Sequence, residues 1–155
     1  MGYGLIEINN DPIINFLIED AIILNLNDTS LNLNVDPSVN NGQDISESTI
    51  ITVATNAANG YIVYEKLKSA LTSVEHPEIM IPSTGSIPAD NYFGYNLTAT
   101  GSATTLFHNS PAVVGSGSST TSGTNWPIYY DLKVNYLKPA GIYKAEIEYT
   151  VSPSF

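Results

Sequence analysis

The sequence contains no cysteine and no arginine. Without cysteine the chain cannot form a disulfide framework, a thiolate nucleophile or a cysteine-ligated metal site. Its only basic side chains besides two histidines are five lysines, set against fifteen acidic residues, which gives a formal net charge of −10. A nucleic-acid-binding protein needs clustered cations to displace counterions from phosphates. We therefore expect no nucleic-acid partner.

Long apolar runs and charged residues are also scarce. No run approaches the roughly 20 apolar residues that a membrane helix needs, so we expect no membrane insertion. Charged residues make up only 13% of the chain, about half the usual share, while hydrophobic residues make up 43%. The polar surface must come from Asn, Thr, Ser and Tyr, as in many β-rich extracellular proteins. We expect residues 1–155 to form a single domain outside the cell.

Side chains suited to catalysis or metal binding are few. The two histidines, His76 and His108, each lie beside turn-forming residues, and neither belongs to an HExxH motif or a paired metal-ligand spacing. Glu75 and Glu78 lie close to His76 in sequence, but a solvated loop explains this group better than a metal site. No GxSxG motif and no phosphate-binding loop is present.

Carboxylate pairs and oxygen-rich loops complete the search for chemistry. Glu146 and Glu148 have the spacing of a carboxylate pair, but Lys144 on the same strand face favours a solvated ladder of charges. Residues 25–28 and 36–44 are rich in Asp and Asn, and neither stretch has the spacing of an EF-hand. We predict that the chain has no catalytic residue, no cofactor and no metal, and that it is not an enzyme.

Alternation of apolar and polar residues is the strongest pattern that the sequence does contain. Two stretches near the end show it, with the apolar positions at Ile128, Tyr130, Leu132, Val134 and Tyr136, and at Tyr143, Ala145, Ile147, Tyr149 and Val151. A short turn containing Pro139 and Gly141 separates them. This pattern predicts an antiparallel hairpin with one solvated face.

Further short strands and turns follow one another along the whole chain. About eight or nine strands with a turn signal every eight to twelve residues are typical of an all-β antiparallel sandwich of immunoglobulin-like or Greek-key type. At most one short helix is expected, between Glu65 and Ser73, where good helix formers occur without Gly or Pro. Residues 115–124 (GSGSSTTSGT) are of low complexity and are expected to form a mobile loop.

Two segments resemble a known family of bacterial surface domains. Residues 50–66 (IITVATNAANGYIVYEK) and 139–153 (PAGIYKAEIEYTVSP) are similar to the WxL-type, immunoglobulin-like β-sandwich domains of Gram-positive and allied bacteria. The Gly-Trp-x-Leu step of that family corresponds here to residues 60–63 (GYIV), and its second Trp-x-Leu to residues 149–151 (YTV), so tyrosine and valine replace both tryptophan and leucine. The resemblance implies a β-sandwich on the cell surface.

The start of the last strand also has the form of a tyrosine corner. In immunoglobulin-like folds such a tyrosine hydroxyl bonds back to an earlier backbone group. Residues 140–143 (AGIY) place Tyr143 directly after a turn. We expect Tyr143 to serve this structural purpose.

The first eighteen residues differ from the rest and suggest how the protein works. They contain two short apolar runs and no basic residue, and they precede the well-patterned strands. We expect an exchangeable strand segment that pairs within its own chain or is donated to a neighbour. The leading hypothesis is therefore a structural or adhesive cell-surface module, a filament or surface-layer subunit whose partners are copies of itself or other surface proteins. The residues expected to drive assembly are Leu5, Ile6, Ile8, Ile13, Ile14 and Phe16.

A glycan- or cell-wall-binding module is the alternative. Trp126 is the only tryptophan, and with Tyr129 and Tyr95 it could form an aromatic platform on which sugars stack. A role for Trp126 in capping the core explains the same residue and is favoured. Both readings stay open at the level of sequence.

Overall fold

The computed structural model describes residues 2–7, 13–34, 36, 43–98, 104–135 and 137–154, with side chains left out of the description for residues 2–17, 43 and 44. Within these residues the regular structure consists of β-strands and includes no helix. In this part of the chain, accordingly, no helix is long and apolar enough to span a membrane.

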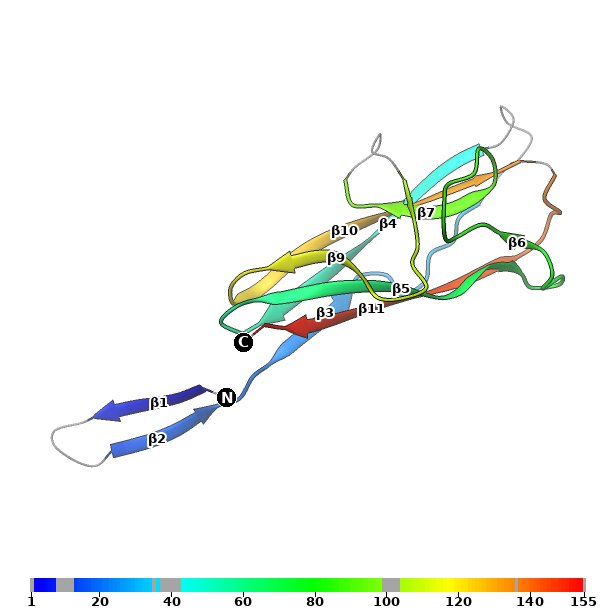
Figure 1. Cartoon of the computed structure of the whole chain (residues 1–155). Coiled ribbons are helices and arrows are strands. Elements are labelled where there is room, and N and C mark those ends of the chain that lie inside the picture. Colours follow the sequence, from blue (N-terminus) through cyan, green and yellow to red (C-terminus); the bar gives the residue numbers. More distant parts are fainter. Residues whose placement is uncertain are drawn as a thin grey trace.

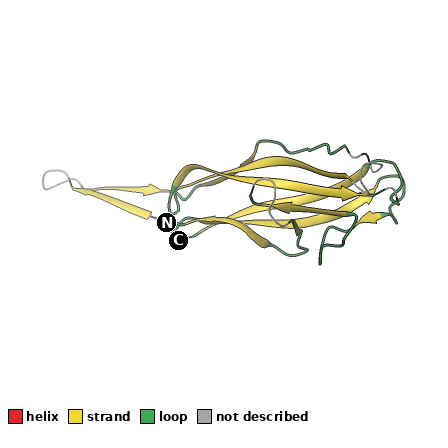
Figure 2. Ribbon diagram, turned by 90° about the horizontal axis from the view of Figure 1, so that it is seen from above, coloured by secondary structure: helices red, strands yellow, loops and turns green. Residues whose placement is uncertain are grey.

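Two antiparallel sheets pack face to face as a β-sandwich, which confirms the predicted fold class (Figures 1 and 2). The first sheet has the order β3 (Ile22–Leu26), β4 (Gln43–Thr55), β10 (Thr121–Val134), β7 (Tyr92–Asn96) and β8 (Thr105–Leu106). The second has the order β11 (Tyr143–Pro153), β5 (Tyr61–Ser73) and β6 (Met80–Ile81), and β9 (Ala112–Gly117) also pairs with β5.

A separate two-stranded ribbon precedes the sandwich. It consists of β1 (Gly2–Glu7) and β2 (Ile13–Ile18), which pair antiparallel with each other. We call these two strands the arm. Figures 1 and 2 show the arm projecting from the end of the sandwich at which both chain termini lie. We call this the proximal end, and the opposite end, with the turns after β5 and before β11, the distal end.

The core fills the space between the sheets. Residues from β4, β5, β7 and β10 supply most of its fully buried side chains, and Phe107 joins them from the segment after β8. Phe107 lies with its ring centroid 5.0 Å from that of Phe93 and 5.1 Å from that of Tyr95. Tilted rings at this separation are favourable for aromatic pairs, so the β8 segment is fixed to the first sheet by aromatic packing.

The short helix allowed for between Glu65 and Ser73 does not form. These residues are the second half of β5, which pairs with β11 along one edge and with β9 and β6 along the other. Burial in β5 alternates, with Tyr61, Val63 and Leu67 facing the core. Pairing on both edges and burial of one face outweigh the intrinsic helix preference of a short segment.

The hairpin predicted near the end of the chain is wrong, although both strands are present and their predicted alternation is right over the described residues; Tyr136 lies outside these. β10 pairs with β4 and β7 in the first sheet, whereas β11 pairs with β5 in the second. The turn between them crosses the sandwich, so the two apolar faces meet across the core. Tyr130 of β10 and Tyr149 of β11 have their hydroxyl oxygens 3.0 Å apart.

The low-complexity segment 115–124 is mostly strand rather than a mobile loop. It forms the end of β9, a short turn and the start of β10. Small residues are required here by close packing: a Cβ added at Gly115 would lie 2.7 Å from the Trp126 ring, and one at Gly117 would lie 2.5 Å from the Tyr61 ring. The glycines therefore make room for two large aromatic side chains, which composition alone did not reveal.

The predicted tyrosine corner is present. The Tyr143 hydroxyl donates a hydrogen bond to the backbone carbonyl of Pro139 at 3.0 Å. This bond closes the turn that leads into β11 and fixes the point at which the strand joins the second sheet.

Candidate functional site

The sandwich is open along the side where β3 and β11 are edge strands. β3 ends at Leu26, and beyond it residues 28–34 and β11 border a groove of about 900 Å³. The groove reaches the apolar interior between the sheets. Its apolar lining includes Leu71, Ile81, Phe93, Leu132, Val134 and Ile147.

The burial of β11 shows how incomplete the core is on this side. The inward-facing residues of β5, the strand next to it, are fully buried at Tyr61, Val63 and Leu67. In β11 the residues that alternate inward, such as Ala145 and Ile147, are only half-buried. An apolar strand face that packs on the core but stays partly exposed has room for a further covering element.

The outer edge of β11 also lacks a partner strand. Within the described residues this eleven-residue strand pairs with β5 alone. Such an edge presents backbone N–H and C=O groups that can accept another strand. The groove and the free edge of β11 therefore form one continuous surface, and this surface is the candidate functional site.

The groove is confined to the distal half of the sandwich. Its lining on β11 runs over residues 143–149, and on β10 it includes Tyr130, Leu132 and Val134. In the proximal half β3 comes close to β11 and covers the core there. An extended segment can therefore enter the groove from the distal end, while β3 blocks the proximal end.

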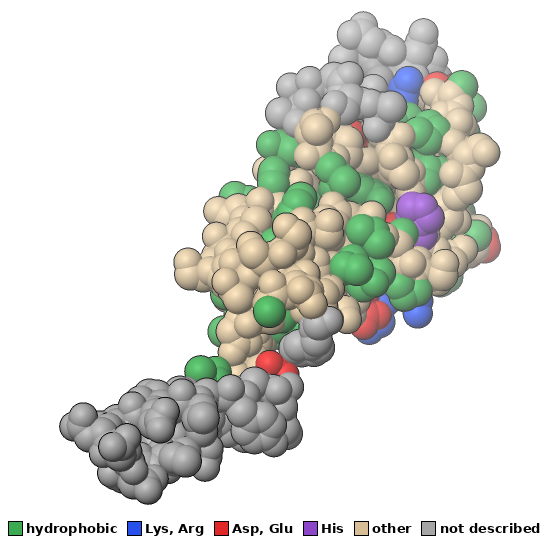
Figure 3. Space-filling view, turned by 60° about the vertical axis from the view of Figure 1, so that its left-hand side comes forward, with side chains coloured by type: hydrophobic (Ala, Val, Ile, Leu, Met, Phe, Trp, Pro, Cys, Tyr) green, Lys and Arg blue, Asp and Glu red, His purple; other side chains and the backbone are tan. Residues whose placement is uncertain are grey.

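Charge on the groove differs from charge on the molecule as a whole. Three of the five lysines line it, together with only two acidic residues, Asp28 and Glu146. The lysines are Lys68, Lys138 and Lys144. On the face seen in Figure 3, charged side chains are sparse among hydrophobic and uncharged ones. The groove is thus a slightly basic region of a chain with net charge −10.

The root of the arm is held to the sandwich by Asn56. Its side-chain oxygen accepts a hydrogen bond from the Ala21 backbone N–H at 2.7 Å, and its side-chain amide donates to the Glu19 carbonyl at 2.8 Å. The Thr55 hydroxyl also donates to the Ala21 carbonyl, at 2.9 Å. These bonds fix where the arm leaves the sandwich.

The structure places the predicted assembly residues in or near the arm. Leu5 and Ile6 lie in β1, and Ile13, Ile14 and Phe16 lie in β2. Ile8 lies outside the described residues. In the arm Ile6 is opposite Ile14, and Gly4 is opposite Phe16. The predicted strands are thus present, and donation to a neighbour stays a prediction.

The predicted glycan residues do not share one exposed surface. Tyr95 is buried in the core against Phe107, and it is paired in register with Tyr130 on the inward face of the first sheet. Trp126 is partly buried, and its indole N–H donates to the Tyr61 hydroxyl at 3.1 Å. Tyr129 lies between inward-facing positions of β10 and so points to the opposite face. Trp126 therefore packs at the edge of the core, as expected if it caps the core and does not bind glycan.

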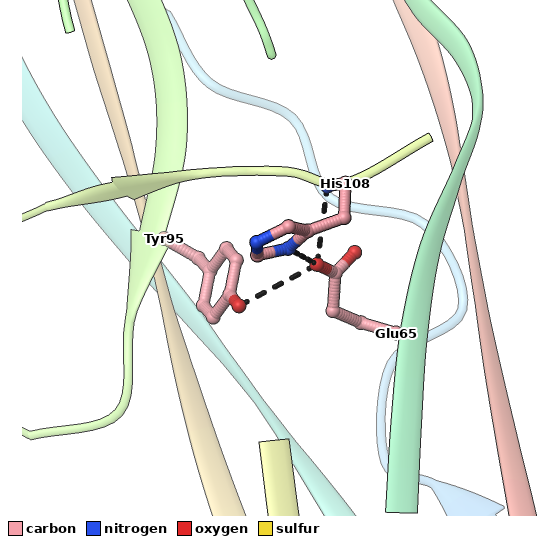
Figure 4. A network of polar contacts seen from close by, with 3 residues as sticks. All are labelled: Glu65, Tyr95 and His108. Carbon is pink, nitrogen blue, oxygen red and sulfur yellow. Dashed lines mark hydrogen bonds and ion pairs between the residues drawn. The ribbon is translucent and has the colours of Figure 1, made fainter. Parts of the chain in front are cut away.

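A polar cluster that sequence reasoning missed is centred on the buried Glu65 (Figure 4). The Glu65 side chain is only 1% exposed, and its Oε1 lies 2.5 Å from Nδ1 of His108, which is 46% exposed. The same oxygen accepts a hydrogen bond from the His108 backbone N–H at 3.2 Å and lies 3.5 Å from the Tyr95 hydroxyl. The alternation of Tyr61, Val63 and Glu65 along one strand was the available signal.

The tyrosines near Glu65 have altered proton affinities. Burial raises the pKa of Tyr95 from 10.0 to about 12, with further contributions from the Glu65 carboxylate charge and from the hydrogen bond to it. Burial also raises the pKa of Tyr149, and the neighbouring Tyr130 adds to that rise. These hydroxyls therefore stay protonated and serve as hydrogen-bonding groups of the core.

The arrangement around Glu65 is better suited to structure than to catalysis. The cluster holds one acid, one histidine and one tyrosine, and it does not line the groove. In the described part of the chain no three His, Cys, Asp or Glu side chains come together as a metal site. The cluster ties the segment after β8 to β5, where the Leu67 N–H also donates to the His108 carbonyl at 2.8 Å.

The other loops considered for metal binding are engaged in local contacts. Nδ1 of His76 lies 3.4 Å from Oε1 of Glu78, with both side chains exposed. The side-chain oxygen of Asn27 accepts hydrogen bonds from the Ile50 N–H at 2.6 Å and from the Thr49 hydroxyl at 2.8 Å. Much of the 36–44 stretch lies outside the described residues.

Comparisons with known proteins give a likeness of fold to solved structures. No family model matches the chain, and no curated protein matches it. A solved structure of a chaperone–tip adhesin complex from the biogenesis of CFA/I fimbriae contains a chain of similar fold, with a TM-score of 0.56 and 15% sequence identity. The match covers 84% of this chain and 42% of that chain. At this identity the likeness supports the β-sandwich fold alone.

Proposed function

We propose that the protein is a structural subunit of an extracellular filament or surface layer, in which the arm of one copy fills the groove of the next. The observation that carries the proposal is the partly exposed inward face of β11 beside a strand edge that has no partner in the described residues. Adding a strand to such an edge supplies backbone hydrogen bonds, while alternate side chains enter the groove. The fold likeness to a chain of a fimbrial chaperone–adhesin complex agrees with a surface role.

The arm has the properties of a donated segment. An isolated two-stranded ribbon is at best marginally stable in water. Five of the six residues of β2 are apolar, the exception being Asn15. Burying an apolar side chain of this size contributes about 1.5–3 kcal/mol. The two or three β2 side chains that face one way would together supply several kcal/mol when covered.

The charges of arm and groove are complementary. No basic residue precedes Lys66, while the first twenty residues contain Glu7, Asp11, Glu19 and Asp20. The groove has more lysines than acids along its lining. Opposite local charges favour one docking geometry over others. The chain's own N-terminal segment is thus a suitable occupant in both apolar character and charge.

The surface role does not require an active site, and we infer that the protein is not an enzyme. Glycan or cell-wall binding stays the alternative prediction, as does membership of the WxL-type domains. Trp126, Tyr95 and Tyr129 do not form a common platform, so no observation on the described residues favours the glycan site over strand donation.

A pair of matched substitutions in β2 tests the proposal. Phe16→Asp replaces an apolar residue with a charge, and Asn15→Asp introduces the same charge at the only polar position of the strand. We expect Phe16→Asp to leave a folded monomer and Asn15→Asp to assemble like the unaltered chain. Light scattering and negative-stain electron microscopy measure assembly, and thermal unfolding checks the sandwich. Assembly of Phe16→Asp at unaltered levels, or a monomeric unaltered chain, would refute strand donation.

A further inference from the structure

The distal end of the sandwich carries exposed apolar side chains with no described role in the fold. Leu137 is 79% exposed and Ile142 is 65% exposed, and Val74 and Met80 are about half exposed. The Val74 N–H donates to the Ile142 carbonyl at 2.8 Å, and Nζ of Lys138 donates to the Met80 carbonyl at 2.8 Å. The first bond places Val74 beside Ile142, and the second places Met80 beside the segment that carries Leu137. We call these four exposed residues the distal patch.

The distal patch is continuous with the groove. Residues 138–143 line the mouth of the groove, and Ile142 belongs to both surfaces. Because β3 comes close to β11 in the proximal half, the chain on either side of a segment that fills the groove leaves it at the distal end, past this point. The body of the donor copy must therefore stand beyond the distal end of the copy that receives its arm.

The lengths of β2 and of the groove would place the root of a donated arm at the groove mouth of the copy that receives it. Six residues of β2 span about 20 Å, and the stretch 143–149 of β11 along the groove spans about 23 Å at 3.3 Å per residue. Once β2 fills the groove, the next residue along the chain lies at the distal patch. At the root of the arm Ile18 is 57% exposed, and it is followed by the exposed Glu19.

We propose that the distal patch is a second contact between copies of this chain, which receives the arm root of the next copy. This inference rests on the proposed strand donation and adds the end-to-end interface that accompanies it. Ile18 packs against Ile142 and Leu137, and Glu19 lies near Lys138. β2 runs antiparallel to β11 in this arrangement, because β11 begins at the distal end and β2 ends there.

The absence of cysteine makes crosslinking a clean test. The double variant Ile18→Cys/Ile142→Cys carries one thiol on each side of the proposed contact. The control, Ile18→Cys/Val113→Cys, has its second thiol on β9, where Val113 is exposed and lies outside both the groove and the distal patch. After mild oxidation of assembled protein, we expect a ladder of covalent oligomers from the first variant and no ladder from the control.

The outcomes separate this inference from strand donation itself. A ladder that is specific to the Ile18/Ile142 pair supports the end-to-end contact. Assembly that depends on Phe16 but gives no ladder, or equal ladders from both pairs, would overturn the contact and leave strand donation standing. Absence of assembly in the unaltered chain would overturn both.

A non-covalent test uses side chains that are already exposed, so the fold is not at risk. Leu137→Ser/Ile142→Ser removes two apolar side chains of the distal patch, and Val113→Ser is the matched control. Since burial of one such side chain shifts an equilibrium by roughly tenfold or more, the double variant should raise the critical concentration for assembly by at least that factor. An unchanged critical concentration would contradict the contact.

Discussion

Gly60 shows how one residue can fix the junction of several strands. Its φ angle of +85° is one that side chains with a Cβ rarely adopt, and a Cβ built there would lie 1.9 Å from the Gly117 carbonyl oxygen. The Gly60 carbonyl accepts a hydrogen bond from the Ser154 N–H at 2.8 Å. The turn into β5, the end of β9 and the residue after β11 therefore meet at this glycine.

Gly60→Ala is expected to lower the free energy of unfolding by about 3 kcal/mol, from backbone strain and overpacking together. Gly85→Ala is the matched control, because Gly85 has a φ of +90° with no atom within 4 Å of an added Cβ. The control should cost about 1 kcal/mol, from strain alone. Denaturant unfolding of both variants measures the difference, and equal losses would show that the close approach to Gly117 is unimportant.

Tyr95 gives a pH dependence with a definite sign. Its pKa is raised in the folded state to about 12 from an ordinary 10.0, so the unfolded chain loses this proton first as the pH rises. The stabilising contribution is therefore complete below pH 10 and is lost progressively as the pH rises from 10.0 towards 12. Tyr149 and Tyr130, whose pKa values are also raised, act in the same direction.

We expect the free energy of unfolding to fall with pH above 10.0, and to fall less steeply in Tyr95→Phe, which cannot ionise at this position. Denaturant titrations at a series of alkaline pH values measure both slopes, and tyrosinate absorbance reports the ionisation directly. Identical slopes in the two proteins would show that Tyr95 does not carry the effect.

At the scale of the element, β11 is the strand whose environment changes most on assembly. In a free copy its outer edge faces solvent along the groove, whereas an arriving strand would engage the same backbone groups. Amide protons that gain a partner exchange more slowly with solvent. We expect peptides spanning residues 143–149 to be protected in assembled protein relative to the Phe16→Asp monomer.

Hydrogen exchange read by mass spectrometry provides its own internal reference. β10 is paired on both edges in a single copy, with β4 and with β7, so its central part should exchange alike in both states. Protection spread evenly over β10 and β11 would indicate general stabilisation instead of strand addition at one edge.

Elements were predictable from sequence where the pattern is local. The alternation of β10 and β11 and the tyrosine corner at Tyr143 depend on residues near one another in the chain, and all are present. Which sheet each strand joins depends on pairing with distant strands: β11 pairs with β5, some eighty residues earlier. For that reason the predicted hairpin between β10 and β11 failed while its strands were correct.

The arm could be predicted from the sequence, whereas the groove that it is proposed to fill could not. The apolar N-terminal runs are visible in the sequence, because they are contiguous and lack basic residues. The groove combines residues of both sheets with the stretch after β3, and the distal patch combines two turns with a residue of β6. Glu65 was missed for a related reason, since its partner His108 comes from another part of the chain. Surfaces made by long-range packing leave little trace in local composition.

At the scale of the whole molecule, net charge governs how copies meet. Each copy has a formal net charge of −10, so copies repel one another at long range, although the groove is slightly basic. Salt shortens the range of this repulsion: the Debye length falls from about 30 Å at 0.01 M to about 8 Å at 0.15 M.

We therefore expect assembly followed by light scattering to proceed faster at 0.15 M than at 0.01 M ionic strength. Lys138→Glu, which reverses one charge at the groove mouth, should assemble more slowly at both. Slower assembly of the unaltered chain with added salt would show that local attraction between the lysines and the arm outweighs the repulsion of whole copies.

The placement of arm and groove at opposite ends has a consequence for growth. A donor surface and an acceptor surface that differ from each other make a head-to-tail contact, which continues indefinitely unless a ring closes. Every copy added to such a chain exposes a fresh acceptor identical to the one just filled. The polymer is therefore polar, its two tips are chemically distinct, and its length is limited by supply or by a terminating molecule that offers only one of the two surfaces.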